Sequence, residues 1–377
     1  MLKLNKIGYS LKDVTVIQTQ QSYVEHRSEV DPYVEICGRK SLPVFVAPMA
    51  TVTDETNYKT WIENKVTPVI PRTVTARLTL QERMELSKDT FVSLSLEEAF
   101  KLSNEEFVFP DKEKRYICVD IANGTMQSLY DACYRIKTKY GETVEIMTGN
   151  IANPEAYRFY CKYGIDWVRC SVGTGSRCIS ACNTAIYYPM ATLLDEINAI
   201  RLEREKEGLF CTKVIADGGI GWFDDIQKSI ALGADAVMTG RLFNECFEAC
   251  YPAYYAVDEE AFVNGETIPF QPGYDFVGEF HTNDGNHEMA NKYKVYREYF
   301  GMSTRTAQAL VGSEGKKTSE GISKPTEVKY PVAKFVDNMT AYLRSCMSYA
   351  GTFTIDEFRC NSEVIILGGS GDVTYRK

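Results

Sequence analysis

Three glycine-containing segments carry the residue types in this chain that could bind and react with a phosphorylated ligand. They are Gly173-Thr-Gly-Ser-Arg-Cys, Ile215-Ala-Asp-Gly-Gly-Ile and Met238-Thr-Gly-Arg. Glycine lets backbone N–H groups approach a phosphate closely, and an aspartate beside such a loop can accept ribose hydroxyls. The first segment ends in Cys178, a thiol that becomes a nucleophile where nearby dipoles or positive charge favour the thiolate. On this segment alone, a structural glycine turn with an incidental cysteine explains the pattern equally well.

Eight short runs rich in β-branched residues are the elements that must position these segments. Their apolar character is nearly continuous, which is typical of strands buried on both faces of a parallel sheet. Segments with helical spacing, such as 154–164 and 224–233, alternate with them. The alternation predicts an α/β fold, a (β/α)8 TIM barrel, with a doubly wound sheet as the alternative. The eight runs are 43–47, 66–70, 91–96, 116–121, 144–148, 167–172, 213–217 and 236–240.

The three glycine segments follow the sixth, seventh and eighth of these runs. In a TIM barrel the active site lies at the carboxyl ends of the strands, and the loops after the last two strands commonly hold a phosphate. Position and motif therefore agree, and we expect one site for a phosphorylated ligand at this end of the barrel.

The rest of the chain is expected to decorate a single domain that spans residues 1–377. Residues 251–298 are rich in Tyr, Asp, Asn, Gly and Glu without a clear period, which predicts a long loop insertion after the eighth strand. A C-terminal extension resumes with a helix over 336–347. Because the chain has neither internal repeats nor a low-complexity linker, one domain is favoured over two.

The composition narrows the range of partners. The 42 Lys and Arg residues against 51 Asp and Glu residues give a net charge of −9 without a long basic run, which disfavours a nucleic-acid partner. No apolar stretch approaches the length of about 18 residues that a membrane helix needs. The twelve cysteines are scattered without a CxxC pair, which is typical of reduced thiols in a cytoplasmic protein and disfavours a structural zinc site. With only three histidines, all in polar segments, we expect chemistry that does not use histidine.

Taken in order, the motifs resemble those of the family of IMP dehydrogenases and GMP reductases. Besides the glycine segments they include Ala47-Pro-Met-Ala-Thr-Val-Thr, Gly149-Asn-Ile, Phe300-Gly-Met-Ser, Ser319-Glu-Gly and Leu343-Arg-Ser-Cys-Met, and the likeness covers residues 11–367. The resemblance implies a barrel that binds a purine mononucleotide, GMP or IMP, and uses a loop cysteine to attack C2 of the base. It also implies a nicotinamide cofactor and a homotetramer.

The resemblance assigns roles to the residues at matching positions. Cys178 is the nucleophile, Ser180 and Glu320 form a proton relay, and Arg72 completes the catalytic group. The substrate-binding positions are Ser176, Asp217, Gly219, Gly240, Arg241, Tyr299, Met302, Ser303 and Lys317. The positions near the cofactor are Asp120, Asn123 and Gly124. The backbone of Gly173, Gly175 and Cys178 would hold a monovalent cation, potassium.

Within this family the chain resembles the reductases more than the dehydrogenases. The dehydrogenases hydrolyse the thioether-linked purine with an Arg-Tyr pair on a mobile flap, but only 17 residues lie between Met302 and Glu320, without such a pair. We therefore expect reductive deamination of GMP to IMP and ammonia with NADPH, or with NADH as the alternative cofactor. Two other readings stay open. One is an IMP dehydrogenase that oxidises IMP to XMP with NAD and takes its water-activating residues from 251–298; the other is a nucleotide-binding barrel without catalysis.

Several positions depart from the pattern of the family. Thr174 stands where the family has proline, Arg177 stands where a small residue precedes the cysteine, and Arg241 replaces glycine or serine. Arg72 and Lys317 stand where the reductases have lysine and arginine, which are not interchangeable at a shaped site. Such changes predict a divergent member with an altered nucleotide preference.

Overall fold

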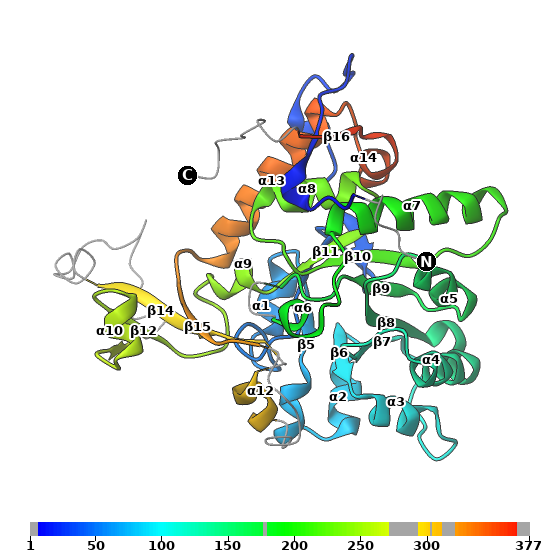
Figure 1. Ribbon diagram of the computed structural model, residues 1–377. Helices are drawn as coiled ribbons and strands as arrows, with labels where there is room; N and C mark the ends of the chain where they lie inside the picture. Colours follow the sequence, from blue (N-terminus) through cyan, green and yellow to red (C-terminus); the bar gives the residue numbers. More distant parts are fainter. Residues whose placement is uncertain (1–6, 176–178, 271–292, 302–303, 311–320, 368–377) are drawn as a thin grey trace.

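Eight parallel strands close into a barrel in the computed structural model, which describes residues 7–175, 179–270, 293–301, 304–310 and 321–367 (Figure 1). The strands follow one another around the ring in chain order, and Val237 of the last strand pairs with Val44 of the first to close it. Each strand coincides with or overlaps one predicted run, so the (β/α)8 TIM barrel is confirmed and the doubly wound sheet is excluded. The strands are β4 (Val44–Val46), β5 (Thr67–Ile70), β6 (Phe91–Leu94), β7 (Arg115–Asp120), β8 (Val144–Ile151), β9 (Trp167–Cys170), β10 (Lys213–Asp217) and β11 (Ala236–Thr239).

Helices surround the barrel on its outer side (Figure 1). The predicted helical segments appear as α5 (Ala156–Lys162), α8 (Phe223–Ala231) and α13 (Val332–Tyr349). None of the helices in the described ranges is long and apolar enough to cross a membrane. Apart from α10 of the insertion, given below, the other helices of the described residues are α1 (Tyr58–Glu63), α2 (Leu80–Leu86), α3 (Leu96–Ser103), α4 (Gln127–Tyr140), α6 (Ser180–Thr184), α7 (Met190–Lys206), α9 (Arg241–Asn244), α12 (Arg305–Leu310) and α14 (Ile355–Asn361). Short 3-10 helices are η1 (Leu11–Asp13), η2 (Arg27–Glu29), η3 (Arg72–Ala76) and η4 (Gly141–Thr143).

Two short antiparallel pairs complete the scaffold around the barrel. Strand β1 (Val14–Val16) pairs with β16 (Val364–Ile366), which joins the two ends of the described chain. Strand β2 (Val34–Ile36) pairs with β3 (Arg39–Ser41) just before the barrel begins.

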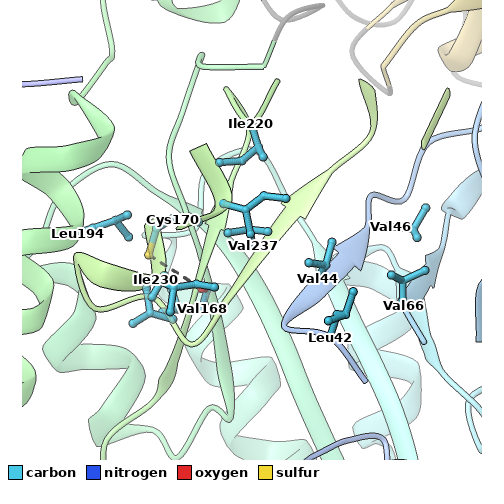
Figure 2. Close-up of a cluster of buried hydrophobic side chains, with 14 of the residues drawn as sticks. Leu42, Val44, Val46, Val66, Val168, Cys170, Leu194, Ile220, Ile230 and Val237 are labelled. Atoms are coloured by element: carbon cyan, nitrogen blue, oxygen red, sulfur yellow. Dashed lines mark hydrogen bonds between the residues drawn. The ribbon is translucent and has the colours of Figure 1, made fainter. Parts of the chain in front are cut away.

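Successive side chains of each barrel strand point to opposite faces of the sheet and so contribute to two separate hydrophobic cores. In β4, Val44 and Val46 belong to the aliphatic layer between strands and helices, part of which is drawn in Figure 2. The intervening Phe45 points into the barrel, where its ring packs edge-to-face on Trp167 at a centroid distance of 5.3 Å. Large side chains therefore fill the barrel interior, and a ligand has to bind at its mouth.

The insertion after β11 contains more regular structure than the expected loop. Its described part includes β12 (Ala253–Ala256), α10 (Glu259–Val263), β13 (Ile268–Pro269) and β14 (Lys294–Tyr299). These strands join β15 (Lys324–Glu327) in an antiparallel sheet of order β13-β12-β14-β15, which stands to one side of the barrel (Figure 1). The strands escape sequence analysis because they are short and rich in Tyr, Arg and Lys rather than aliphatic residues.

Candidate active site

A cavity of about 820 Å³ opens at the carboxyl ends of the barrel strands. This volume lies in the usual range for a small-molecule site. The three glycine segments meet there, as the sequence predicts for strands six, seven and eight. The predicted site residues that line the cavity are Asp120, Gly173, Gly175, Asp217, Gly219, Gly240, Arg241 and Tyr299.

Two glycines in the loops after β10 and β11 lie where a side chain does not fit. Gly218 has a φ of +89°, and a Cβ on it would lie 2.7 Å from Oγ1 of Thr174. A Cβ on Gly240 would collide with Met49 Sδ and would lie 2.7 Å from the Tyr299 hydroxyl. Both positions therefore need glycine, because neighbouring side chains of the cavity wall pack directly against the main chain there.

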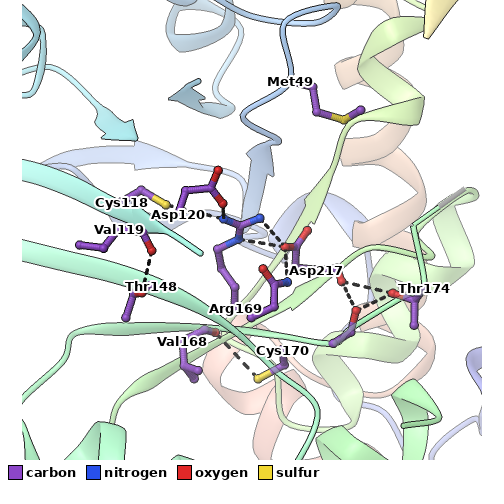
Figure 3. A network of polar contacts seen from close by, with 12 residues as sticks. Met49, Cys118, Val119, Asp120, Thr148, Val168, Arg169, Cys170, Thr174 and Asp217 are labelled. Atoms are coloured by element: carbon purple, nitrogen blue, oxygen red, sulfur yellow. Dashed lines mark hydrogen bonds and ion pairs between the residues drawn. The ribbon is translucent and has the colours of Figure 1, made fainter. Parts of the chain in front are cut away.

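Arg169 of β9 joins two of the acidic residues that line the cavity, Asp120 and Asp217 (Figure 3). Its Nη1 donates to Asp120 Oδ1 at 2.7 Å, while its Nε donates to Asp217 Oδ2 at 2.9 Å. Burial lowers the pKa of Arg169, but Asp217 and Asp120 outweigh that effect and hold the pKa well above its usual value. The guanidinium is therefore a fixed positive charge between two carboxylates.

Asn150 of β8 gives Asp217 a further contact. Its Nδ2 donates to Asp217 Oδ2 at 2.7 Å, the same oxygen that Arg169 contacts. Because these contacts fall on Oδ2, the described part of the chain leaves Asp217 Oδ1 available to a ligand hydroxyl. This arrangement suits the ribose-binding role that the sequence assigns to Asp217.

Arg72 lies on the far side of Asp120, at the start of η3. Its Nε is 3.6 Å from Asp120 Oδ2. Burial raises the pKa of Asp120, but the positive charges of Arg169 and Arg72 outweigh it and hold the pKa below the ordinary value. Asp120 is therefore an ionised carboxylate at neutral pH, held between two arginines.

Thr174 takes part in the site although it departs from the proline of the family. Its Oγ1 lies 2.5 Å from Ser171 Oγ, which also contacts the carbonyl oxygen of Asp217 at 2.5 Å. The two hydroxyls tie the loop after β9 to the end of β10. A proline at 174 could not supply this link.

Tyr299 reaches the cavity from β14 of the inserted sheet. Its hydroxyl lies 3.3 Å from Met49 Sδ, and its side chain is buried. Two residues earlier in the same strand, Arg297 is buried and donates to four backbone carbonyls, at Asn244, Cys246, Phe247 and Tyr251. Burial lowers the pKa of Arg297 to about 10. Arg297 thus fastens the strand that carries Tyr299 to the chain that follows β11.

Other predicted residues lie close to the cavity without lining it. Asn123 bonds locally to Thr125, with its Oδ1 2.7 Å from the Thr125 hydroxyl. Gly124 is buried, and its carbonyl accepts from the Tyr160 hydroxyl at 2.9 Å. Ser180 is the first residue of α6, just after the cysteine loop. The structure therefore brings Asp120, but not Asn123, Gly124 or Ser180, to the wall of the cavity.

Seven residues of the sequence analysis lie outside the described residues, so their predicted roles stay predictions. They are Ser176, Arg177, Cys178, Met302, Ser303, Lys317 and Glu320. The expected potassium site includes the backbone of Cys178 and is not assigned here. Among the described residues, no group of three or more His, Cys, Asp or Glu side chains could hold a metal ion.

Sequence reasoning missed Arg169 and gave no role to Asn150, although the motif Gly149-Asn-Ile contains it. The signal for Arg169 was present, because a single arginine interrupts the apolar run 167–172 and a charge inside a buried strand needs partners. Asn150 lies at the end of its strand, where polar residues face the mouth of a barrel. The sequence did not show which carboxylates would contact Arg169 and Asn150 in the folded chain.

The fold and the cavity define a TIM-barrel protein with a glycine-lined ligand site at the carboxyl ends of its strands. A family model described as "IMP dehydrogenase / GMP reductase domain" matches residues 108–262. A GMP reductase of Clostridium acetobutylicum is 30% identical in an alignment 383 residues long. The alignment covers 97% of this chain and 99% of that protein. A GMP reductase of Shouchella clausii is 28% identical over 97% of this chain and 98% of its own length.

Dehydrogenases match over a shorter region. An inosine-5'-monophosphate dehydrogenase of Chlorobaculum parvum is 30% identical over 264 residues, 68% of this chain. The chain spans about half the length of that relative, namely 46%. The chain belongs to the IMP dehydrogenase/GMP reductase family, a family of oxidoreductases.

Proposed function

We propose that the protein is a GMP reductase, which converts GMP to IMP and ammonia at the expense of NADPH. One observation carries the proposal: the alignment with the C. acetobutylicum GMP reductase covers 99% of that protein, whereas the alignment with the C. parvum dehydrogenase covers 46%. The short segment between Met302 and Glu320, without an Arg-Tyr pair, points in the same direction.

The nucleotide would lie across the mouth of the barrel. Asp217 Oδ1 accepts a ribose hydroxyl while Arg169 and Asn150 hold Oδ2 in place. The backbone at Gly219 and Gly240 offers N–H groups to the 5'-phosphate. Of the other substrate positions, Ser176 and Tyr299 serve the phosphate, and Met302 and Ser303 serve the base.

The chemistry would run through the cysteine loop. The Cys178 thiolate adds to C2 of the purine, and the amino group takes up a proton and leaves as ammonia. Ser180 and Glu320 carry that proton. After C2 has accepted a hydride, the bond between carbon and sulfur breaks, the thiolate returns to Cys178 and IMP is released.

The residues near Asp120 fit a nicotinamide cofactor. The buried Nε of Arg72 lies 3.6 Å from Asp120 Oδ2, which is longer than a hydrogen bond, so it could still donate to a carboxamide oxygen. Asp120 lines the cavity beside it, with Asn123 and Gly124 in the following loop. When bound, NADPH supplies the hydride for C2. Asp120 and Arg72 would hold and orient the ring.

The test is a pair of reactions with the purified full chain. One contains GMP and NADPH, the other IMP and NAD, and the absorbance of the reduced cofactor is followed in both. The proposal expects loss of NADPH in the first reaction and no change in the second. Production of NADH in the second reaction would establish a dehydrogenase. No change in either would favour a nucleotide-binding barrel without catalysis. Repeating the first reaction with NADH tests the cofactor preference.

A further inference from the structure

Ser171 comes directly after β9, at the start of the loop that leads to Cys178. Its φ is +128°, a backbone conformation that favours glycine, and the residue is buried. Such a backbone costs free energy in any residue other than glycine, and it persists only where the surroundings fix it. The contacts of the Ser171 side chain show what fixes it.

The Ser171 hydroxyl is the middle member of a short chain of hydrogen bonds. It donates to the carbonyl oxygen of Asp217 at 2.5 Å. Because a hydroxyl has only one proton to give, Thr174 is the donor in the contact of 2.5 Å between the two hydroxyls. Thr174 Oγ1 also lies 3.4 Å from the same carbonyl oxygen (Figure 3). Each bond of such a chain polarises the next, so we expect the two hydroxyls to act as one unit.

Thr174 also packs against the chain that follows Asp217. A Cβ on Gly218 would lie 2.7 Å from Thr174 Oγ1, and a Cβ on Gly219 would lie 3.5 Å from Thr174 Cβ. The loop after β9 and the loop after β10 are therefore in direct contact at this threonine.

On its other side, the loop after β9 packs against α6. A Cβ on Gly173 would lie 2.5 Å from the Cβ of Ala181, in the first turn of that helix. Gly173 precedes Cys178 in the sequence and Ala181 follows it. The chain before the cysteine is therefore held both to the helix after the cysteine and to the end of β10.

We infer that Ser171 and Thr174 are positioning residues for the proposed reaction, because they hold the loop that leads to Cys178 at a fixed place relative to Asp217. The inference rests on the proposed function, in which Asp217 binds the ribose and Cys178 attacks the base. The pair should then set the rate of the chemical step rather than the affinity for GMP, since a misplacement of about 1 Å can cost about a hundredfold in rate. The threonine that departs from the proline of the family thus has a task that needs a hydroxyl.

Thr174→Val tests the inference, since valine keeps the branched side chain and lacks the hydroxyl. With saturating GMP and NADPH, kcat of the full chain should fall about tenfold or more, while the dissociation constant for GMP in a calorimetric titration changes about threefold or less. Thr174→Ser keeps the hydroxyl and should retain most of the rate. Thr138→Val, on the exposed surface of α4, is the matched control and should change neither quantity.

Ser171→Gly separates positioning from backbone strain. Glycine accepts the φ of +128° without strain, so this variant should stay folded, and its kcat should still fall about tenfold or more because the hydroxyl is gone. If the two hydroxyls act as one unit, Ser171→Gly combined with Thr174→Val should lose no more rate than Ser171→Gly alone. Thermal melting of each variant shows that it is folded before its rate is measured.

The outcomes separate this inference from the proposed function. A wild-type kcat in Thr174→Val overturns the inference alone. A loss of GMP affinity as large as the loss of kcat also overturns it, since the link would then hold the nucleotide rather than the reacting loop. Losses that multiply in the double variant contradict the action of the hydroxyls as one unit. Absence of NADPH consumption by the wild type overturns the proposed function and the inference that rests on it.

Discussion

Arg169 and Asp217 form a close ion pair at the mouth of the barrel, with Nη2 of the arginine 2.8 Å from Oδ2 of the aspartate. The same guanidinium contacts Asp120 at 2.7 Å, so one buried side chain holds the proposed ribose and cofactor carboxylates at a fixed separation. The orientation of both ligands should therefore depend on a residue that need not touch either of them.

Removal of this charge should destabilise the protein strongly. Arg169→Met leaves two largely buried carboxylates without their common partner, and breaking a buried ion pair typically costs about 3–5 kcal/mol. Urea unfolding of wild type and variant measures the loss. Arg158→Met, which removes an exposed arginine paired on the surface, should cost less than about 1 kcal/mol. A similar small loss for Arg169→Met would show that the network does not hold the site together.

The contribution of Asp120 to the free energy of unfolding should decrease as the pH falls. Its pKa in the folded protein lies below the ordinary value, so the contribution is fully present above the unfolded pKa of about 3.9 and is lost as the pH falls through the folded pKa. Asp120→Asn should therefore unfold more easily than wild type at pH about 7, and the difference should shrink in acid.

The measurement is urea unfolding of both proteins at several pH values between neutral and acid. Asp131→Asn, on the exposed side of α4, serves as the control for a general loss of one carboxylate. A difference between wild type and Asp120→Asn that stays constant or grows in acid contradicts the account of Asp120.

A methyl group at Gly240 should block the nucleotide site. The new Cβ would lie 2.7 Å from the Tyr299 hydroxyl and collide with Met49, so both side chains have to move. We expect Gly240→Ala to weaken GMP binding by about tenfold or more, since small displacements in a shaped site are costly. In Gly301→Ala the Cβ meets Met49 at 3.8 Å, an ordinary contact, and the loss should be smaller. Equal losses in a titration with GMP would contradict the role of Gly240.

Arg297 should matter for binding although it lies outside the cavity. Arg297→Met removes the donors to four backbone carbonyls, and we expect a loss of about 3 kcal/mol or more in unfolding free energy. Because β14 carries Tyr299, GMP affinity should fall as well in the folded fraction. Tyr299→Phe separates the two effects, since it should reduce affinity with little change in unfolding. A variant at 297 that melts and binds like wild type would show that the sheet is held in another way.

The sequence was sufficient to predict the barrel and the glycine segments that line the cavity at its mouth. Continuous apolar runs such as 213–217 identify buried parallel strands, and the glycines that follow them mark where the backbone must stay bare. The partners of Arg169 could not be predicted, because Asp120 and Asp217 are 49 and 48 residues away in the chain. Only closure of the barrel brings them together.

The inserted sheet shows a second limit of prediction from the sequence. Val295, Arg297 and Tyr299 alternate along β14, but all three are buried, together with Tyr296, so the strand does not show a clean apolar pattern. Its partners β12 and β15 come from either side of it in the chain. The resemblance of sequence motifs predicts Tyr299 at the site, where it lines the cavity, but not the sheet and the buried arginine that place it there.

The most direct test of the central claim, reduction of GMP through Cys178, is NADPH consumption by the full chain and by Cys178→Ala in the presence of GMP. The account predicts that the wild type oxidises NADPH and releases IMP and ammonia in equal amounts, whereas Cys178→Ala binds GMP in a titration without turnover. Turnover by Cys178→Ala would contradict the covalent mechanism, and no NADPH consumption by the wild type would contradict the assignment as a reductase.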